Sequence, residues 1–360
     1  MTILELFIGF TLSLVLSLSL TPLVSKLAVR MGAVDHPNER KIHVKVMPRI
    51  GGLAIIIAFT IGLLVLQPKT EFIWSILAGS FVITITGMVD DLYSVRPIVK
   101  FGGQMIAALL VVSDGLLIDK ITVPFYGTLE MDFLSIIITL FWIVGVTNAI
   151  NLIDGLDGLA AGVSSIGLAS LAIIGAIDGR IIIVQFSTLL IGACLGFLYH
   201  NFYPAKIYMG DTGALFLGYW ISIISMLGLF KNVAIFSFIL PIFIIAIPIF
   251  DTLFAIVRRL ISKQSIGQAD RKHIHHRLIA MGYSHRKSVL IIYLLSSVFA
   301  LLAIVYTSVT LQTTLIIVTV LLLTLQLMAE LTGFIPENQF FALKFIRKCK
   351  YIIKDKWRVK

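Results

Sequence analysis

Long, almost uninterrupted apolar runs constrain the fold of this chain more than any other feature of its sequence. They recur along 360 residues, of which 58% are hydrophobic and only 13% are charged. A soluble domain carries about 25% charged residues. A run of about 20 apolar residues can cross the hydrocarbon core of a bilayer as a helix. The sequence therefore predicts an all-α, polytopic bundle of transmembrane helices.

Eleven spans can be counted, and the short gaps at 67–71 and 309–312 leave ten or twelve spans open. The first run is too long for a cleaved signal peptide, and Met1–Glu5 contains no Lys or Arg. It is therefore predicted to be a retained helix. The predicted spans lie near residues 3–23, 50–66, 72–89, 98–117, 133–149, 157–177, 181–199, 213–230, 233–250, 288–308 and 311–334.

Basic residues predict the orientation of these spans. All but four of the 29 Lys and Arg residues fall on one side of the predicted membrane, and the four exceptions are Lys69, Lys120, Arg180 and Lys231. The side rich in Lys and Arg is normally cytoplasmic, which places the N-terminus outside and the C-terminus inside. The net charge of +10 follows from this topology and requires no nucleic-acid partner. The predicted location is the cell membrane, with the basic loops on its cytoplasmic side.

Acidic and amide side chains gather at the predicted cytoplasmic ends of the spans, although that side was assigned from Lys and Arg alone. An Asp at the centre of a membrane helix costs about 2.5–3.5 kcal/mol on insertion scales, so acids beside spans need a reason. Their gathering predicts a functional site at the cytoplasmic face. The residues are Asp90, Asp91, Asn148, Asn151, Asp154, Asp157, Asp211 and Asp251.

The first group is the adjacent pair Asp90 and Asp91 at the end of the third predicted span. Two neighbouring carboxylates repel each other unless a cation or strong hydrogen-bond donors hold them. The pair therefore indicates a divalent-metal or acid–base site, with Lys100 near enough to neutralise charge or bind phosphate. The alternative is a solvated helix end, which is the commoner meaning of an isolated Asp-Asp pair.

The second group recurs every three residues between the fifth and sixth predicted spans, so that its members share one face of a helix. Glycines within the group allow a ligand to approach the backbone. Carboxylate and amide oxygens are hard ligands that suit Mg²⁺, which also takes oxygens from substrate phosphates and water. A polar turn is the alternative, although it would not require four such side chains in register. The four are Asn148, Asn151, Asp154 and Asp157.

Asp211 stands where the eighth predicted span begins. At such a position it is either the N-cap of the helix or a ligand for a metal–phosphate group. The sequence leaves both open.

Two basic loops complete the predicted site. In the loop after the ninth span, Arg271, His273, His275 and His276 suggest recognition of an anion such as a diphosphate. The alternative is a solvated basic loop that obeys the positive-inside rule. In the first loop, Lys45 and Arg49 would lie at the membrane surface and hold a lipid phosphate, or they only set the orientation.

Together these segments resemble the polyprenyl-phosphate N-acetylhexosamine-1-phosphate transferases, over residues 20–290. Within that family the chain is more similar to the TagO/WecA branch than to MraY, because it contains HIHHR rather than three adjacent histidines. The matching motifs are PNERKIHVKVMPRIGG, GMVDDLYSVRPIVKFGGQ, NAINLIDGLDGLAAG, YMGDTGALFLG and ADRKHIHHRL, in this order. Five ordered motifs make chance agreement improbable.

The resemblance implies a Mg²⁺-dependent enzyme, with Mn²⁺ as an alternative cofactor. Such an enzyme moves N-acetylglucosamine 1-phosphate from UDP-N-acetylglucosamine to undecaprenyl phosphate, releases UMP, and opens synthesis of a cell-envelope polymer such as teichoic acid. It also implies roles for residues: Asp90 and Asp91 catalytic, Asp211 and Asn151 as Mg²⁺ ligands. The remaining candidates would bind substrate: Lys100, Asn148, Asp154, Asp157, Arg271, His273, His275, His276, Lys45 and Arg49.

The sequence leaves two other functions open. An MraY-type reaction with a peptide-bearing nucleotide sugar is the nearest alternative. A cation-coupled transporter or lipid flippase is an alternative of another class, but such proteins usually place charged sites at the bilayer midplane in two repeated halves. No repeat is evident here, and the acids lie at one face.

The predicted organisation is one domain with a tail. Residues 1–334 form the transmembrane catalytic domain, with cytoplasmic loops at 24–49, 90–100, 148–157, 200–212 and 251–287. Residues 335–360 form a basic cytoplasmic tail that is attracted to anionic membrane lipid, at about 1 kcal/mol per basic residue. The sequence leaves open whether the chain forms a homodimer.

Overall fold

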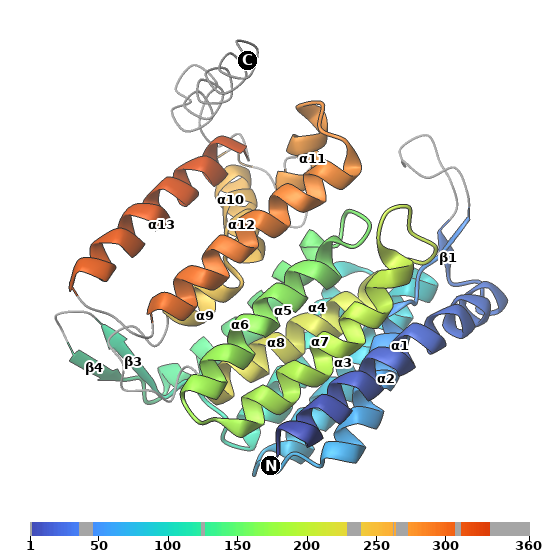
Figure 1. Cartoon of the computed structure of the whole chain (residues 1–360), viewed down its shortest axis with the longest axis horizontal. Helices are drawn as coiled ribbons and strands as arrows, with labels where there is room; N and C mark the ends of the chain where they lie inside the picture. Colours follow the sequence, from blue (N-terminus) through green and yellow to red (C-terminus); the bar gives the residue numbers. More distant parts are fainter. Residues whose placement is uncertain are drawn as a thin grey trace, which may run out of the picture.

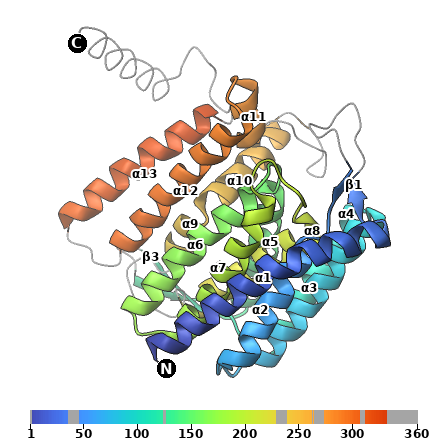
Figure 2. The same ribbon diagram turned by 45° about the vertical axis from the view of Figure 1, so that its right-hand side comes forward.

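The computed structural model describes residues 2–35, 46–123, 127–228, 239–261, 263, 273–306 and 311–331. Lys45, Arg271 and the predicted tail at 335–360 lie outside these residues. Thirteen helices occur within the described ranges, packed side by side in one bundle (Figures 1 and 2). They are α1 Ile3–Met31, α2 Gly52–Leu66, α3 Ile73–Tyr93, α4 Pro97–Ser113, α5 Leu134–Ile153, α6 Leu159–Ile177, α7 Ile181–Asn201, α8 Gly210–Gly228, α9 Ile239–Ile244, α10 Ala246–Ile261, α11 Ile274–Ala280, α12 His285–Tyr306 and α13 Leu311–Leu331.

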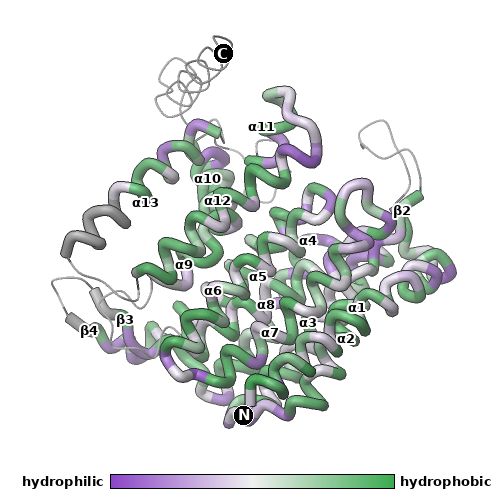
Figure 3. Tube along the Cα trace, in the orientation of Figure 1, coloured by the Kyte–Doolittle hydropathy of each residue, from purple (hydrophilic) through white to green (hydrophobic). Residues whose placement is uncertain are grey.

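The helical membrane class is confirmed, but the count of eleven spans is not. Seven helices in the described ranges are long and apolar enough to cross a bilayer: α1, α3, α5, α6, α7, α8 and α12. The helices α2 and α4 and the segment Thr319–Leu331 of α13 are apolar but shorter. Figure 3 shows apolar residues along the middle of the helices and hydrophilic ones toward both ends of the bundle.

Several boundaries differ from the predicted spans. Helix α1 continues past residue 23 to Met31, where Gly32 ends it in the left-handed conformation, so the first part of the predicted loop 24–49 is helical. The predicted span 233–250 lies partly outside the described residues, and the described part is divided between α9 and α10. Polar and charged residues can continue a helix beyond the bilayer, so hydropathy alone does not locate the ends of these helices.

The fold is also not purely α-helical. Two short antiparallel strand pairs, which the sequence did not predict, occur in the part of the chain that the structure describes. The strands β1 (Val34–Asp35) and β2 (Met47–Pro48) pair beside the site described below, and β3 (Lys120–Val123) and β4 (Gly127–Glu130) pair between α4 and α5. The β3–β4 pair lies at the same end of the bundle as the N-terminus, and α11 lies at the opposite end (Figure 1).

Helix α8 is the centre of the bundle, buried along almost its whole length and packed against α2, α3, α5, α6 and α7. Its aromatic residues anchor it to α3. Tyr219 donates a hydrogen bond to the carbonyl of Ile76 at 2.9 Å, and Trp220 Nε1 donates to Ser80 Oγ at 2.9 Å. These bonds satisfy polar atoms that would otherwise be unpaired in an apolar interior. The position of α8 relative to α3 is thereby fixed.

Glycines let α8 approach its neighbours closely. A Cβ added at Gly87 of α3 would lie 2.6 Å from the Cα of Thr212, and one added at Gly218 of α8 would lie 2.6 Å from the Cα of Thr147 on α5. Real Cβ atoms do not approach other atoms so closely. These contacts bring the first turn of α8 against the last turn of α3, where the acidic residues lie.

Candidate active site

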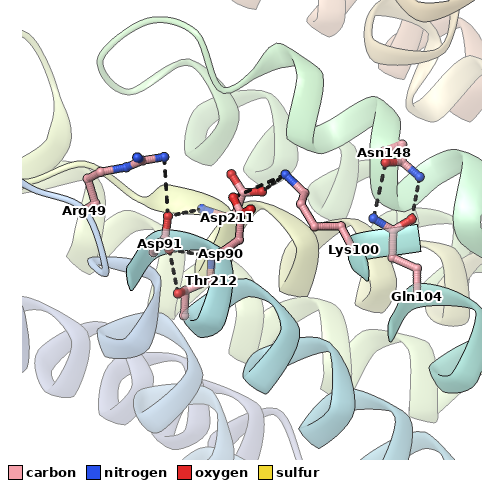
Figure 4. A network of polar contacts seen from close by, with 8 residues as sticks. All are labelled: Arg49, Asp90, Asp91, Lys100, Gln104, Asn148, Asp211 and Thr212. Carbon is pink, nitrogen blue, oxygen red and sulfur yellow. Dashed lines mark hydrogen bonds and ion pairs between the residues drawn. The ribbon is translucent and has the colours of Figure 1, made fainter. Parts of the chain in front are cut away.

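Three helix ends meet at one end of the bundle and bring three charged side chains together. Asp90 lies in the last turn of α3, Lys100 in the first turn of α4 and Asp211 in the first turn of α8 (Figure 4). Lys100 Nζ lies 3.4 Å from Asp90 Oδ2 and also contacts Asp211 Oδ2. One ammonium group therefore lies between two carboxylates contributed by different helices.

Asp91 points to the other side of α3 and caps α8. Its Oδ1 accepts from the backbone N–H of Asp211 at 3.0 Å, and its Oδ2 accepts from the N–H and hydroxyl of Thr212 at 2.9 and 2.7 Å. Arg49 lies 3.7 Å from Asp91 Oδ1. Because these groups occupy both oxygens of Asp91, this residue holds the start of α8 against α3, whereas Asp90 faces Lys100.

This arrangement answers the question that the sequence left open for Asp211. Helix α8 begins at Gly210, which has a φ of +70°, and Asp91 from α3 pairs with the first exposed amides of α8. The side chain of Asp211 is therefore not needed as a cap. It faces Lys100 and Asp90, where it is available to a ligand.

We expect Asp91→Ala to destabilise the protein more than a change at Asp90 or Asp211. The substitution leaves two buried backbone N–H groups and one hydroxyl without an acceptor, and an unpaired buried donor costs about 1–3 kcal/mol. Thermal unfolding of the detergent-solubilised protein measures this effect. An unfolding temperature equal to that of the wild type would contradict the capping role of Asp91.

Helices α4 and α5 are joined by a reciprocal amide pair. Gln104 Nε2 donates to Asn148 Oδ1 at 3.2 Å, and Asn148 Nδ2 donates to Gln104 Oε1 at 2.5 Å and to the carbonyl of Val144 at 2.8 Å. Figure 4 shows this pair beside Lys100, which lies one turn before Gln104 on α4. The amide of Asn148, expected to bind substrate, is thus engaged with a neighbouring helix.

The α5–α6 junction contributes Asn151 and Asp154. Asn151 lies in the last turn of α5, and Asp154 follows the end of that helix. Burial is the main cause that raises the pKa of Asp154 to about 8; the negative charges of Asp211 and Asp91 contribute to this shift, and Arg49 opposes it. This electrostatic coupling places Asp154 within the field of the α3 and α8 carboxylates, as the clustering of acids in the sequence predicted.

The raised pKa of Asp154 predicts how stability depends on pH. Between about pH 4 and about pH 8 the folded state binds more protons at this carboxyl than the unfolded state, so ionisation at higher pH destabilises the fold. We expect Asp154→Asn to remove this term. In a metal-free buffer, the unfolding temperature of the variant minus that of the wild type should increase between about pH 6 and about pH 9. Parallel curves for the two proteins would contradict the coupling.

Asp157 lies on the same junction but is used mainly within the protein. Its Oδ2 accepts from the N–H of Ala205 at 2.9 Å, and its own N–H donates to His285 Nε2 at 2.9 Å. The next residue, Gly158, donates to Asn201 Oδ1 at 3.0 Å. These bonds fasten the junction to the α7–α8 loop and to α12, so Asp157 holds Asp154 in place.

The histidines of α11 approach the junction from the other side. A Cβ added at Gly155 would lie 2.7 Å from His275 Cε1, so the absence of a side chain there admits the His275 ring. His276 packs beside His275, with ring centroids 4.2 Å apart. Burial lowers the pKa of His275 to about 3, helped by the neighbouring His276 and His273. His275 is therefore neutral near pH 7 and offers hydrogen bonds rather than positive charge.

The structure thus brings together most of the predicted site residues, but it gives them different contacts. Asp90, Lys100 and Asp211 touch, Asp91 and Arg49 lie behind them, and Asp154 is coupled to them by charge. Three contributing residues had no prediction of their own: Gln104 and Thr212 fall inside recognised motifs, and His285 carried no signal in the sequence. Asp251 was predicted as one of the clustered cytoplasmic acids, without a role assigned to it.

Binding of Mg²⁺ at this site depends on the side-chain oxygens that lie close together there. Among the described residues, no three His, Cys, Asp or Glu side chains lie close enough together to hold one metal ion. Mg²⁺ does not need such a cage, since it binds through one or two carboxylates plus water and substrate phosphates. In the described part of the chain, five carboxyl groups lie at this site beside the cations Arg49 and Lys100. Burial raises the pKa of Asp154 to about 8, and the negative charges of Asp211 and Asp91 contribute to this shift. The residues present therefore fit a divalent cation.

The fold and the site define a helical membrane protein with an acidic site formed at adjacent helix ends, and comparison with known proteins identifies the class. Residues 73–229, which include α3 to α8, match Glycosyl transferase family 4. A relative from Bacillus subtilis (strain 168), named "Probable undecaprenyl-phosphate N-acetylglucosaminyl 1-phosphate transferase", is 48% identical over 343 residues, covering 95% of this chain and 96% of the relative.

Two more distant relatives have related names. The decaprenyl-phosphate N-acetylglucosaminephosphotransferase of Mycolicibacterium smegmatis is 37% identical over 303 residues, covering 75% of this chain and 74% of the relative. The undecaprenyl-phosphate alpha-N-acetylglucosaminyl 1-phosphate transferase of Escherichia coli (strain K12) is 27% identical over 348 residues, covering 93% and 87%. The chain belongs to this family of polyprenyl-phosphate N-acetylglucosamine-1-phosphate transferases, which confirms the resemblance seen in its motifs.

Proposed function

We propose that this protein transfers N-acetylglucosamine 1-phosphate from UDP-N-acetylglucosamine to undecaprenyl phosphate and releases UMP. The observation that supports this most directly is the meeting of Asp90, Lys100 and Asp211 at adjacent helix ends. The names of the relatives support the acceptor and the transferred group. Membership of an enzyme family favours a transferase over the transporter alternative.

Both substrates are phosphate esters, whereas the site is rich in carboxylates. Without added positive charge, the carboxylates of Asp90 and Asp211 would repel them. We infer that Asp211 and Asn151 hold Mg²⁺, which would supply positive charge to the phosphates during displacement. Lys100 is the residue of this chain that is placed to neutralise a phosphate oxygen, because its ammonium lies between two helices at the site.

In the reaction, an oxygen of the lipid phosphate forms a bond to the β-phosphorus of the UDP-sugar. The bond from that phosphorus to the bridging oxygen breaks, and UMP leaves with the electron pair. A phosphate monoester has a second pKa near 6, so the attacking oxygen is largely ionised at neutral pH. Asp90 is therefore proposed to orient the lipid phosphate through Lys100 rather than to remove a proton.

The proposed reaction is tested by incubating the purified protein with undecaprenyl phosphate, Mg²⁺ and one UDP-sugar at a time. UDP-N-acetylglucosamine should release UMP and form a lipid-linked sugar diphosphate, and chelation of Mg²⁺ should stop both. UDP-glucose serves as the control for the N-acetyl group. A UDP-sugar bearing a peptide on muramic acid tests the MraY-type alternative, and release of UMP from that substrate alone would overturn the proposal.

We further propose that the site faces the cytoplasm and that the product opens synthesis of a cell-envelope polymer such as teichoic acid. Basic residues support this orientation. Arg30 lies in the last turn of α1, and Arg258 and Arg259 lie in the last turn of α10. Both helices end at the end of the bundle where α11 lies (Figure 1).

This orientation predicts the accessibility of introduced cysteines. After Cys349 is replaced by Ser, a cysteine at Lys206, near the site, should react with an impermeant thiol reagent only when the membrane is opened. A cysteine at Lys120, in the β3–β4 pair, should react in intact cells. Cysteines at Lys45 and Ser265, outside the described residues, should behave like the one at Lys206. The reverse pattern would contradict the use of cytoplasmic UDP-sugars.

A further inference from the structure

Asp251 is the one acid of the predicted cytoplasmic group to which neither the sequence nor the proposed reaction assigns a role. It lies on α10, where it is only 2% exposed. Its Oδ2 lies 2.8 Å from His273 Nδ1, and its Oδ1 accepts from the backbone N–H of Ile274 at 2.9 Å. Both oxygens are therefore engaged by the start of α11.

His273 is linked to the acidic site through its neighbour. The rings of His273 and His275 are parallel to within 3°, with centroids 5.9 Å apart. His275 in turn packs on Gly155, the residue that follows Asp154. Its Nδ1 is buried and has no hydrogen-bond partner among the described residues. A displacement of His273 would therefore disturb the surface that α11 presents to the α5–α6 junction.

The carboxylate of Asp251 also determines which nitrogen of His273 remains available. An ionised carboxylate only accepts hydrogen bonds, so His273 Nδ1 must carry the hydrogen in their contact. This leaves Nε2 for another partner. A carboxylate that holds Nδ1 in this way fixes both the tautomer and the orientation of an imidazole.

We propose that Asp251 is a positioning residue for the transfer reaction, holding His273 so that Nε2 is available to the diphosphate of the nucleotide sugar. The inference rests on the proposed function, because the diphosphate belongs to the proposed donor. Capping of α11 alone is the competing role. The two differ in which hydrogen bond of Asp251 matters, the one to His273 or the one to Ile274.

The test measures UMP release and the KM for UDP-N-acetylglucosamine in Asp251→Asn, His273→Ala and the double variant. Asparagine has one acceptor oxygen, so it cannot serve both donors of α11. We expect Asp251→Asn to lower kcat/KM by about 10- to 100-fold, the range seen when a group that orients a functional histidine is lost. In the His273→Ala background the same substitution should add little further loss, because it acts through the missing imidazole.

Ile274→Pro and Ile274→Ala separate positioning from capping. Proline at the first helical position lacks the N–H that Asp251 accepts, and the conformation of His273, with φ −61° and ψ 153°, is one that precedes proline readily. The alanine variant reproduces the loss of the Ile274 side chain while retaining that N–H. If Asp251 positions His273, the proline and alanine variants should have the same kcat/KM.

Two results would overturn the positioning role alone. One is a loss of kcat/KM in Ile274→Pro as large as that in Asp251→Asn, without such a loss in Ile274→Ala. The other is additive losses of kcat/KM in the double variant, measured where the wild type is fully active. A wild type that releases no UMP from any UDP-sugar would instead overturn the proposed function and this inference together.

Discussion

Asp211→Asn should abolish most of the transfer activity and leave the fold unchanged. The carboxylate is proposed to hold Mg²⁺ and contacts Lys100, so its loss removes a charge at the reacting phosphates. Removal of one preorganised electrostatic group typically costs about 10²–10³-fold in kcat. The fold should persist because Asp91, not Asp211, caps α8. UMP release and thermal unfolding of the same preparation measure the two effects separately.

Asp114→Asn is the matched control for this experiment. Asp114 follows α4 at the opposite end of that helix from Lys100, where its Oδ2 accepts a hydrogen bond from Ser75 at 2.7 Å. The same chemical change there should leave UMP release unaltered. Near-normal turnover of Asp211→Asn at ordinary Mg²⁺ concentration would mean that the metal site is misplaced.

Asp90→Asn should lower kcat by about 10²–10³-fold, the typical cost of removing one preorganised polar group from a reacting centre. Its dependence on pH distinguishes two roles. If Asp90 positions the lipid phosphate and Lys100, the deficit relative to the wild type should stay constant as the pH rises above the second pKa of the phosphate, near 6. We expect this result, because Asp90 lies 3.4 Å from the Lys100 ammonium and the nucleophile is already ionised.

A general base would give a different profile. In that case the deficit of Asp90→Asn should shrink at alkaline pH, where the lipid phosphate no longer needs to lose a proton. The KM for UDP-N-acetylglucosamine should change little in either case, since Asp90 is proposed to act on the lipid substrate. A deficit that fades with rising pH would therefore rule out the positional role.

The sequence by itself determined the class of the protein and the place of its site. Apolar runs of this length must form helices, because a bilayer offers no water to satisfy the peptide groups of any open structure. Alternating spans return every second helix end to the same side, so acids on α3, α5 and α8 had to gather there. The ordered motifs then identified the family, and this step requires no knowledge of contacts between side chains.

The tertiary structure decided what each acidic residue does. Asp90 and Asp91 are adjacent in sequence, yet one faces Lys100 and the other accepts a hydrogen bond from Asp211, 120 residues later, at the start of α8. For Asp211 the sequence left capping and metal binding open, and its side chain is not needed as the cap of α8. Asn148 pairs with Gln104 on another helix. Such roles depend on how closely helices approach, here at Gly87 beside Thr212. Hydropathy and motif spacing do not encode that distance, because long-range packing between helices sets it.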